Sequence, residues 1–96
     1  MILKRTAKLT TKFEQALIYA TQLHANQTRK VDKIPYISHL MSVSALILEA
    51  GGTEDEAIAG LLHDAIEDQG GQATREEIRE KFSETVVEIV DGCTET

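Results

Sequence analysis

The stretch GLLHDAIED, residues 60–68, places four ionisable side chains in a segment that is otherwise apolar. His63 and Asp64 are adjacent, and Glu67 and Asp68 follow them by one helical turn. The apolar residues of this segment cover nearly every direction around a helix, which predicts a helix buried on most sides. Burying an ionised carboxylate without a partner costs several kcal/mol, so Asp64 needs a positively charged partner.

A divalent metal ion would supply that positive charge. The side chains of His63 and Asp64 can converge on an ion beside the helix, and His39 in the stretch PYISHL is a candidate third ligand. Imidazole and carboxylate ligands suit manganese, iron, zinc or nickel, and this mixture does not choose among them. Glu67 and Asp68 would then flank the open side of the metal, where a carboxylate can orient or deprotonate bound water. The pattern therefore indicates metal-assisted hydrolysis.

The same residues also fit a purely structural arrangement. A His-Asp pair in a helix is usually a salt bridge, and Glu67 with Asp68 could form a solvated helix end before Gly70 and Gly71. We favour the metal site because three features coincide. These are a buried helix, two carboxylates one turn further on, and His39 placed just after a stiff Pro-Tyr dipeptide.

Four further residues bear on chemistry outside this motif. His24 lies on an apolar helix face and is expected to be a hydrogen-bonded core residue and not a ligand. Cys93 is expected to pack in the core without a reactive environment. Arg29 and Lys30 lie in a polar segment, where charges are usually solvated, but a polyphosphate ligand would favour such groups beside a metal.

Apolar residues recur with a helical period along the chain, and no segment alternates apolar and polar residues over the length of a strand. Three pairs with capping-box spacing predict helix starts: Thr11 with Glu14, Thr53 with Glu56, and Thr74 with Glu77. The helix that starts at the second pair carries the stretch GLLHDAIED. A last helix is expected to present one apolar face, formed by Val86, Ile89, Val90 and Cys93.

The predicted helices are separated by short polar or glycine-containing segments. Residues 26–36 are polar, contain the only proline and are expected to form a loop. A second helix is expected over about residues 37–50, before a pair of glycines. The sequence therefore predicts an all-α bundle of about five helices joined by short loops.

Charge is spread unevenly along the 96 residues, whose formal net charge is −6. Residues 1–33 carry a local charge of +5 and residues 34–96 a local charge of −11. The negative balance argues against nonspecific nucleic-acid binding, which relies on many Lys and Arg contacts to phosphate. A small anionic ligand held by a few local cations is compatible with it.

Length and cysteine content limit the number of domains and the cellular setting that we expect. A chain of 96 residues is at most one domain with one modest core. A single cysteine excludes an internal disulfide, and the sequence contains neither the apolar region of a signal peptide nor an apolar run long enough for a membrane span. We therefore expect a reducing, cytoplasmic setting and no membrane role.

Three stretches of the sequence resemble the HD-domain hydrolases of the RelA/SpoT type, and they occur in the same order as in that family. HANQTRKVDKIPYISHL is similar to that family's H-x-x-Q-x-R-K segment followed by P-Y-I-x-H. LLHDAIED is similar to its HDxxED motif, and FSETVVEIVDGCTET to its F-x-x-x-V-x-x-L-V-x-G-x-T element. The resemblance runs from about residue 13 to the last residue. It is strongest to the small single-domain members, including the metazoan SpoT homologue and its bacterial relatives.

The resemblance implies an all-α, manganese-dependent enzyme that removes the 3′-pyrophosphate of the guanosine polyphosphate alarmones ppGpp and pppGpp. It also implies a role for each candidate site residue: metal binding by His39, His63 and Asp64, action on water by Glu67 and Asp68, and nucleotide binding by Arg29 and Lys30. An isolated HD dipeptide would be weak evidence for these roles, whereas the ordered set of motifs is specific for the family.

The chain departs from the family in one respect. Family members run well beyond 96 residues and have a fourth metal ligand, an Asp in a later K-x-A-D-x-x-x-N segment, whereas Asp91 and Glu95 here belong to the V-D-G-x-T element. Residues 1–96 are therefore expected to be the N-terminal portion of the fold, with uncovered apolar surface that favours self-association. Two alternatives stay open: an HD phosphohydrolase with another nucleotide substrate, and a truncated, non-catalytic HD module.

Overall fold

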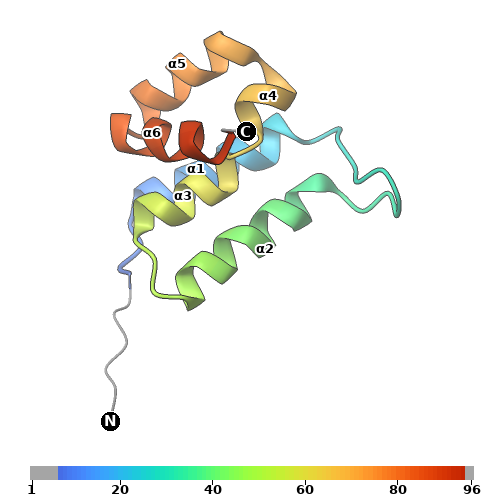
Figure 1. Ribbon diagram of the computed structural model, residues 1–96. Helices are drawn as coiled ribbons and strands as arrows, with labels where there is room; N and C mark the ends of the chain where they lie inside the picture. Colours follow the sequence, from blue (N-terminus) through green and yellow to red (C-terminus); the bar gives the residue numbers. More distant parts are fainter. Residues whose placement is uncertain (1–6, 95–96) are drawn as a thin grey trace.

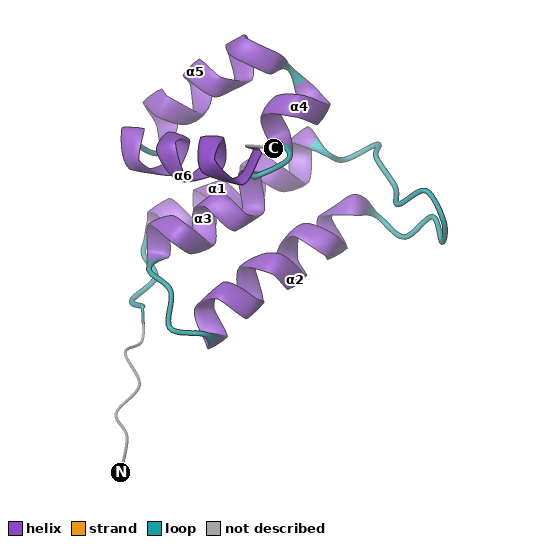
Figure 2. Cartoon of the chain, in the orientation of Figure 1, coloured by secondary structure: helices purple, strands orange, loops and turns teal. Residues whose placement is uncertain are grey.

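Among residues 7–94, which the computed structural model describes, every regular element is a helix, and Thr28 and Pro35 form one isolated bridge. Side chains are described for residues 7–92. Figure 2 shows the helices joined by loops. In chain order they are α1 (Thr11–Leu23), α2 (Tyr36–Glu49), α3 (Glu54–Leu62), α4 (Ala65–Gln69), α5 (Gly71–Lys81) and α6 (Glu84–Thr94). The predicted all-α fold is confirmed.

Helix α3 is the centre of the bundle. It packs against α1, α2 and α6, and Figure 1 shows it running between α2 on one side and α6 on the other. The short helix α4 follows it and packs against α5, which also contacts α6. Residues 57–62 of α3 are all buried, so this helix is covered on every side, as its apolar pattern predicts.

The hydrophobic core surrounds α3. Its members come from α1, α3, α4, α5, α6 and the turn after α5: Ala16, Ala20, Ile58, Ala59, Leu61, Leu62, Ala65, Ile78, Phe82, Val86, Val87 and Val90. Burying one large aliphatic side chain contributes roughly 1.5–3 kcal/mol, so these contacts dominate the stability of the bundle. The predicted core packing of Cys93 concerns a side chain outside the described residues. Within the described part of the chain, every helix is too short or too polar to traverse a bilayer.

The start of α3 follows the predicted capping box. The hydroxyl oxygen of Thr53 accepts a hydrogen bond from the amide of Glu56 at 3.1 Å, and the Glu56 carboxylate accepts one from the amide of Thr53 at 2.8 Å. Two amides that have no partner inside the helix are satisfied in this way. The preceding helix ends as predicted, because Gly51 adopts a positive φ of 92° that favours glycine.

The predicted third helix does not run through residues 60–68. It ends at Leu62, His63 and Asp64 form a turn, and α4 begins at Ala65, so the bundle contains six helices in the described range. Gly60 has one of the last carbonyls of α3, which lack partners within the helix. His63 donates to it from its ring nitrogen Nδ1 at 2.7 Å, so the side chain helps to end the helix.

Two other predicted helix starts are wrong. Helix α1 is capped by Thr10 and not by Thr11, because the Thr10 hydroxyl accepts from the amide of Lys12 at 3.2 Å. Thr74 lies inside α5, three residues after its start at Gly71, and its hydroxyl donates back to the carbonyl of Gln69 at 3.3 Å. In both places a threonine hydroxyl bonds to a backbone group at a helix end, and the partner depends on where the chain enters the helix.

Candidate metal centre

The three residues predicted as metal ligands lie together where α2 begins and α3 ends. One donor atom from each of His39, His63 and Asp64 lies within 4.8 Å of the other two. His39 is in the first turn of α2, whereas His63 and Asp64 form the turn between α3 and α4. The side chains of His63 and Asp64 are about one-fifth exposed, at 21% and 22%. The cluster is therefore partly open to solvent at a helix junction. The sequence had predicted that His63 and Asp64 lie within a buried helix, and this is wrong.

Close packing of α2 on α3 brings His39 to the other two residues. Gly60 of α3 has no side chain where α2 passes, and a Cβ atom there would lie 2.8 Å from Cδ1 of Ile47. Ser44 of α2 is buried and donates from its hydroxyl to the carbonyl of Ala57 in α3 at 2.9 Å. The two helices are thus held together one to three turns from the cluster.

The donor set fits a cation. Because Nδ1 of His63 donates to Gly60, a neutral imidazole presents a lone pair at Nε2, which faces Oδ2 of Asp64 at 3.2 Å. A lone pair and a carboxylate oxygen repel each other unless a proton or a metal ion lies between them. Donor atoms bound to one metal ion at about 2.1 Å lie about 3–4 Å apart, so the His63–Asp64 spacing suits a shared ion.

The structural alternative, a plain salt bridge, is also compatible with part of this geometry. A protonated His63 would pair with Asp64 without any metal. However, a salt bridge does not require a second imidazole, and the ring of His39 lies edge-on to that of His63 with 5.6 Å between their centroids. The presence of three donors at one point is therefore the observation that favours a metal.

Tyr36 supports this cluster from the first residue of α2. Its hydroxyl donates to Oδ2 of Asp64, and its ring lies 5.4 Å from that of His39 between centroids. Burial raises the pKa of the Tyr36 hydroxyl well above its usual value, and the hydrogen bond to Asp64 raises it further. Tyr36 therefore keeps its proton at neutral pH and orients the carboxylate, which is the function of residues that support metal ligands.

The predicted catalytic pair lies one turn beyond the cluster. Glu67 and Asp68 are exposed residues of α4, and the amide of Asp68 donates to the carbonyl of Asp64 at 2.9 Å. The side chain of Asp68 accepts a hydrogen bond at 3.3 Å from Nε2 of Gln27, which lies in the loop before α2. Both carboxylates are therefore accessible to water close to the proposed ligands.

The two predicted nucleotide-binding residues lie on the exposed loop between α1 and α2, which projects from the bundle (Figure 1). Arg29 is 3.8 Å from Asp32, and its positive charge lowers the pKa of Tyr36 in opposition to the effects of burial and Asp64. Lys30 is exposed near the tip of the same loop. The structure therefore places these two residues outside the three-residue cluster, with Arg29 close enough to act on Tyr36 electrostatically.

His24 matches its prediction as a buried, hydrogen-bonded residue. It is 2% exposed, and its Nδ1 lies 2.8 Å from Oε1 of Gln27. The hydrogen bonds of Gln27 and of the Tyr36 hydroxyl were not predicted from the sequence, although both residues appear in the stretches that carry the family resemblance. The signal that could have found them is that a polar and an aromatic residue flank the segment predicted to carry a metal ligand. Their hydrogen-bond partners, Asp68 and Asp64, lie far away in the sequence.

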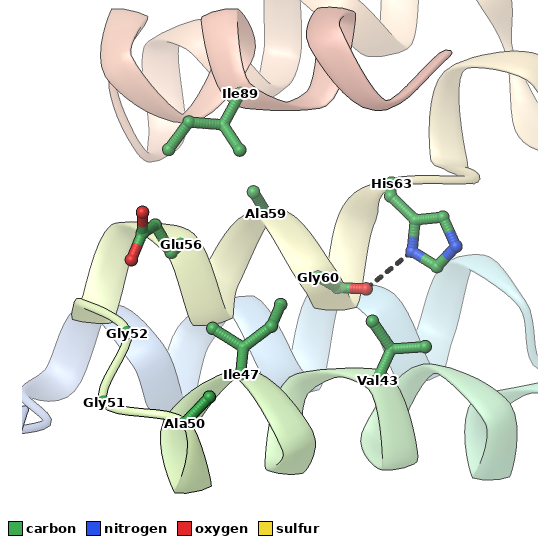
Figure 3. A pocket seen from close by; sticks show the side chains of 10 residues that line it. All are labelled: Val43, Ile47, Ala50, Gly51, Gly52, Glu56, Ala59, Gly60, His63 and Ile89. Carbon is green, nitrogen blue, oxygen red and sulfur yellow. Dashed lines mark hydrogen bonds between the residues drawn. The ribbon is translucent and has the colours of Figure 1, made fainter.

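An apolar groove of about 570 Å³ leads away from the cluster between α2, α3 and α6. Figure 3 shows His63 at one end of it and Glu56 toward the other end. Ile47 of α2 and Ile89 of α6 line opposite walls. The volume is within the usual range of small-molecule sites. The groove is thus apolar surface beside His63 that the described residues leave open.

Replacing Tyr36 by phenylalanine tests the support of Asp64. The change removes only the hydroxyl donor, and we expect the affinity for Mn²⁺ to fall roughly 10- to 100-fold, as is usual for residues that support ligands. Isothermal titration calorimetry with MnCl₂ measures this affinity. Tyr19→Phe is the matched control, because the Tyr19 hydroxyl donates to Glu77 at 2.5 Å on α5, away from the cluster. Equal affinities in the two variants would contradict this role of Tyr36.

Known proteins similar to this chain include a pyrophosphohydrolase and a pyrophosphokinase that are named for guanosine nucleotides. A guanosine-3′,5′-bis(diphosphate) 3′-pyrophosphohydrolase of Aquifex aeolicus is 39% identical over 83 residues, which are 86% of this chain and 12% of that protein. A GTP pyrophosphokinase of Myxococcus xanthus is 38% identical over 81 residues, 84% of this chain and 10% of that protein. The matched regions of these two relatives are therefore small parts of much longer chains.

A solved structure shares the fold. It is described as "A metazoan ortholog of SpoT hydrolyzes ppGpp and plays a role in starvation responses", with a TM-score of 0.81 and 34% identity over 93% of this chain. The chain spans about half of that protein, 51% of its length. These similarities confirm the resemblance to the RelA/SpoT-type hydrolases. The family model for the HD domain matches residues 16–96. Because that match covers most of its length, the chain belongs to the HD-domain family.

Proposed function

We propose that this chain carries the metal-binding part of a phosphohydrolase that removes the 3′-pyrophosphate from guanosine polyphosphates. The observation that carries the proposal is the convergence of three donors, from His39, His63 and Asp64, with two exposed carboxylates one turn away. Its support from known proteins is the similarity to a named 3′-pyrophosphohydrolase and to a solved structure described as hydrolysing ppGpp.

The residues of the chain would divide the reaction among them. A bound divalent ion would supply Lewis acidity and lower the pKa of water at the site. His39, His63 and Asp64 would hold the ion, and Glu67 or Asp68 would accept a proton from the attacking water. The water oxygen bonds to the phosphorus attached to the 3′ oxygen, the bond between that phosphorus and the 3′ oxygen breaks, and pyrophosphate leaves. The 3′ oxygen takes up a proton.

Substrate binding would use the loop between α1 and α2. Arg29 and Lys30 are exposed there and carry positive charge, which suits a ligand with several phosphates. Arginine can bind two phosphate oxygens at once, whereas lysine acts as a point charge. We propose that these two residues contact the nucleotide and that manganese is the metal. The cytoplasm remains the expected setting.

Pyrophosphate release tests the proposal directly. The chain is incubated with Mn²⁺ and ppGpp, and products are separated by anion-exchange chromatography. We expect GDP and pyrophosphate in equal amounts, and no release from GDP itself, which lacks a 3′-pyrophosphate. A panel of other nucleotides separates this substrate from the alternative of an HD phosphohydrolase with different specificity. A chain that binds Mn²⁺ and leaves ppGpp intact would contradict the proposed activity.

A non-catalytic HD module is the second candidate. It is favoured by the similarity to a protein named as a GTP pyrophosphokinase, whose name describes a transfer and not a hydrolysis. The exposed apolar groove beside His63 also suits a surface that another chain covers. Elemental analysis of the purified protein separates the two candidates, because the module needs no bound transition metal. Self-association through the groove stays a prediction, which sedimentation velocity checks.

A further inference from the structure

A series of side-chain hydrogen bonds joins buried His24 to exposed Asp68. Nδ1 of His24 lies 2.8 Å from Oε1 of Gln27, and Nε2 of Gln27 donates to Oδ2 of Asp68 at 3.3 Å. Gln69 donates from Nε2 to the same oxygen of Gln27 at 2.5 Å. Gln27 therefore connects the segment after α1 with two neighbouring residues of α4.

The orientation of the Gln27 amide decides which atom Asp68 meets. One end of the amide is an oxygen that only accepts hydrogen bonds, the other is a nitrogen that only donates, and the two ends have nearly the same shape. A proton on Nδ1 of His24 requires the oxygen to face His24, so that the nitrogen faces Asp68. In the reverse orientation the amide oxygen would face the carboxylate, and the two acceptors would repel each other.

The surroundings of His24 favour a proton on Nδ1. Its other ring nitrogen, Nε2, is buried and has no hydrogen-bond partner among the described residues. An unpaired buried donor costs about 1–3 kcal/mol, so the proton is better placed on Nδ1, where Gln27 accepts it. The ring of Tyr36 lies against His24, with 5.4 Å between the centroids and 34° between the planes, and restricts its rotation.

The backbone of Gln27 is hydrogen-bonded to that of Tyr36, whose hydroxyl supports Asp64 in the three-residue cluster. The amide of Tyr36 donates to the carbonyl of Gln27 at 2.9 Å, and the bridge between Thr28 and Pro35 continues this pairing. Tyr36 donates in turn to Asp64, one helical turn before Asp68. One paired segment thus supplies a donor to each of these two carboxylates.

We propose that Gln27, oriented by His24, is a positioning residue for Asp68. The consequence for catalysis rests on the proposed function, in which Asp68 acts on the attacking water. Asp68 is exposed on a helix of only five residues, so its carboxylate would otherwise rotate among several rotamers. A misplacement of about 1 Å can lower a rate on the order of 100-fold, so holding one rotamer has a measurable effect.

A change of Gln27 to methionine tests the kinetic consequence. Gln27→Met keeps the length of the side chain but removes the donor to Asp68, and we expect kcat for ppGpp hydrolysis with Mn²⁺ to fall roughly 10- to 100-fold. KM should change little, because the interaction acts on the reacting water. Gln72→Met is the matched control, since Gln72 donates to Glu76 at 3.0 Å on the exposed face of α5. An unchanged kcat in Gln27→Met would overturn the proposal.

Nuclear magnetic resonance tests the arrangement without catalysis. In the ¹⁵N-labelled chain without nucleotide, we expect the proton of His24 on Nδ1. We also expect Asp68→Ala to shift the side-chain amide signals of Gln27 and to leave those of Gln72 in place. The proposal would be overturned, even in an active enzyme, if His24 carried its proton on Nε2. It would also be overturned if Asp68→Ala left the side-chain amide signals of Gln27 unchanged. The expected signals in a chain without hydrolysis would support the positioning and count against the proposed function.

Discussion

Replacing Asp64 by alanine is expected to abolish tight metal binding and to lower the proposed ppGpp hydrolysis at least about 1,000-fold. Asp64 is the only anionic donor in the three-residue cluster, and its removal leaves two imidazoles that carry no compensating negative charge. Metal assistance contributes several kcal/mol to such reactions, and each ~1.4 kcal/mol is a factor of ten in rate. Elemental analysis gives the metal content, and pyrophosphate release gives the rate.

Asp55→Ala is the matched control for this variant. Asp55 lies in the first turn of α3 and pairs with Lys12 at 2.8 Å, at the end of that helix away from the cluster. We expect this control to retain both the metal and the activity. If Asp64→Ala instead retained one metal ion per chain and its full rate, Asp64 would be the partner of His63 in a plain salt bridge.

Replacing Leu62 by alanine is expected to lower the free energy of unfolding by about 2–5 kcal/mol. Leu62 is fully buried in the core and is the last residue of α3, next to His63. The change removes buried apolar contacts and leaves a cavity that neighbouring helices fill only in part. Because domains of this size are stable by only about 5–15 kcal/mol, the loss is a large share of the total. Urea unfolding followed by circular dichroism measures it.

Leu46→Ala controls for the loss of an aliphatic side chain as such. Leu46 lies in α2 and is 64% exposed, so the same substitution there should change the free energy of unfolding by less than about 0.5 kcal/mol. Comparable losses in the two variants would contradict the central position of α3 in the core. Leu62→Ala should also weaken Mn²⁺ binding, since the turn that holds His63 and Asp64 follows directly.

Much of the helical architecture could be predicted from local patterns. The apolar spacing of α1, α2 and α6 and the capping box at Thr53 depend on residues only three or four positions apart, which is the range over which a helix is specified. The capping-box spacing was not sufficient at Thr11 and Thr74. A threonine can cap a helix only if the chain turns into the helix at that residue, and the packing of neighbouring elements decides where it turns.

The break after Leu62 shows the same limit at the candidate site. The apolar residues on either side of His63 and Asp64 keep a helical spacing, so the pattern predicted one continuous buried helix. The structure has a turn at His63 and Asp64, with the His63 ring bonded to the carbonyl of Gly60. The spacing of apolar residues shows which faces of a helix can be buried. It does not show whether a polar side chain will form a hydrogen bond with a backbone carbonyl and so help to end the helix.

The sequence by itself determined the helical class, the covered central helix and the types of side chain available for chemistry, because these follow from composition and short-range spacing. The tertiary structure alone decided that His39 meets His63 and Asp64, that Tyr36 donates to Asp64, and that Gln27 reaches Asp68. Those contacts join residues at least 24 positions apart, the separation of His39 and His63. Only the packing of α2 and the loop before it against α3 and α4 brings such residues together, and no local propensity encodes that approach.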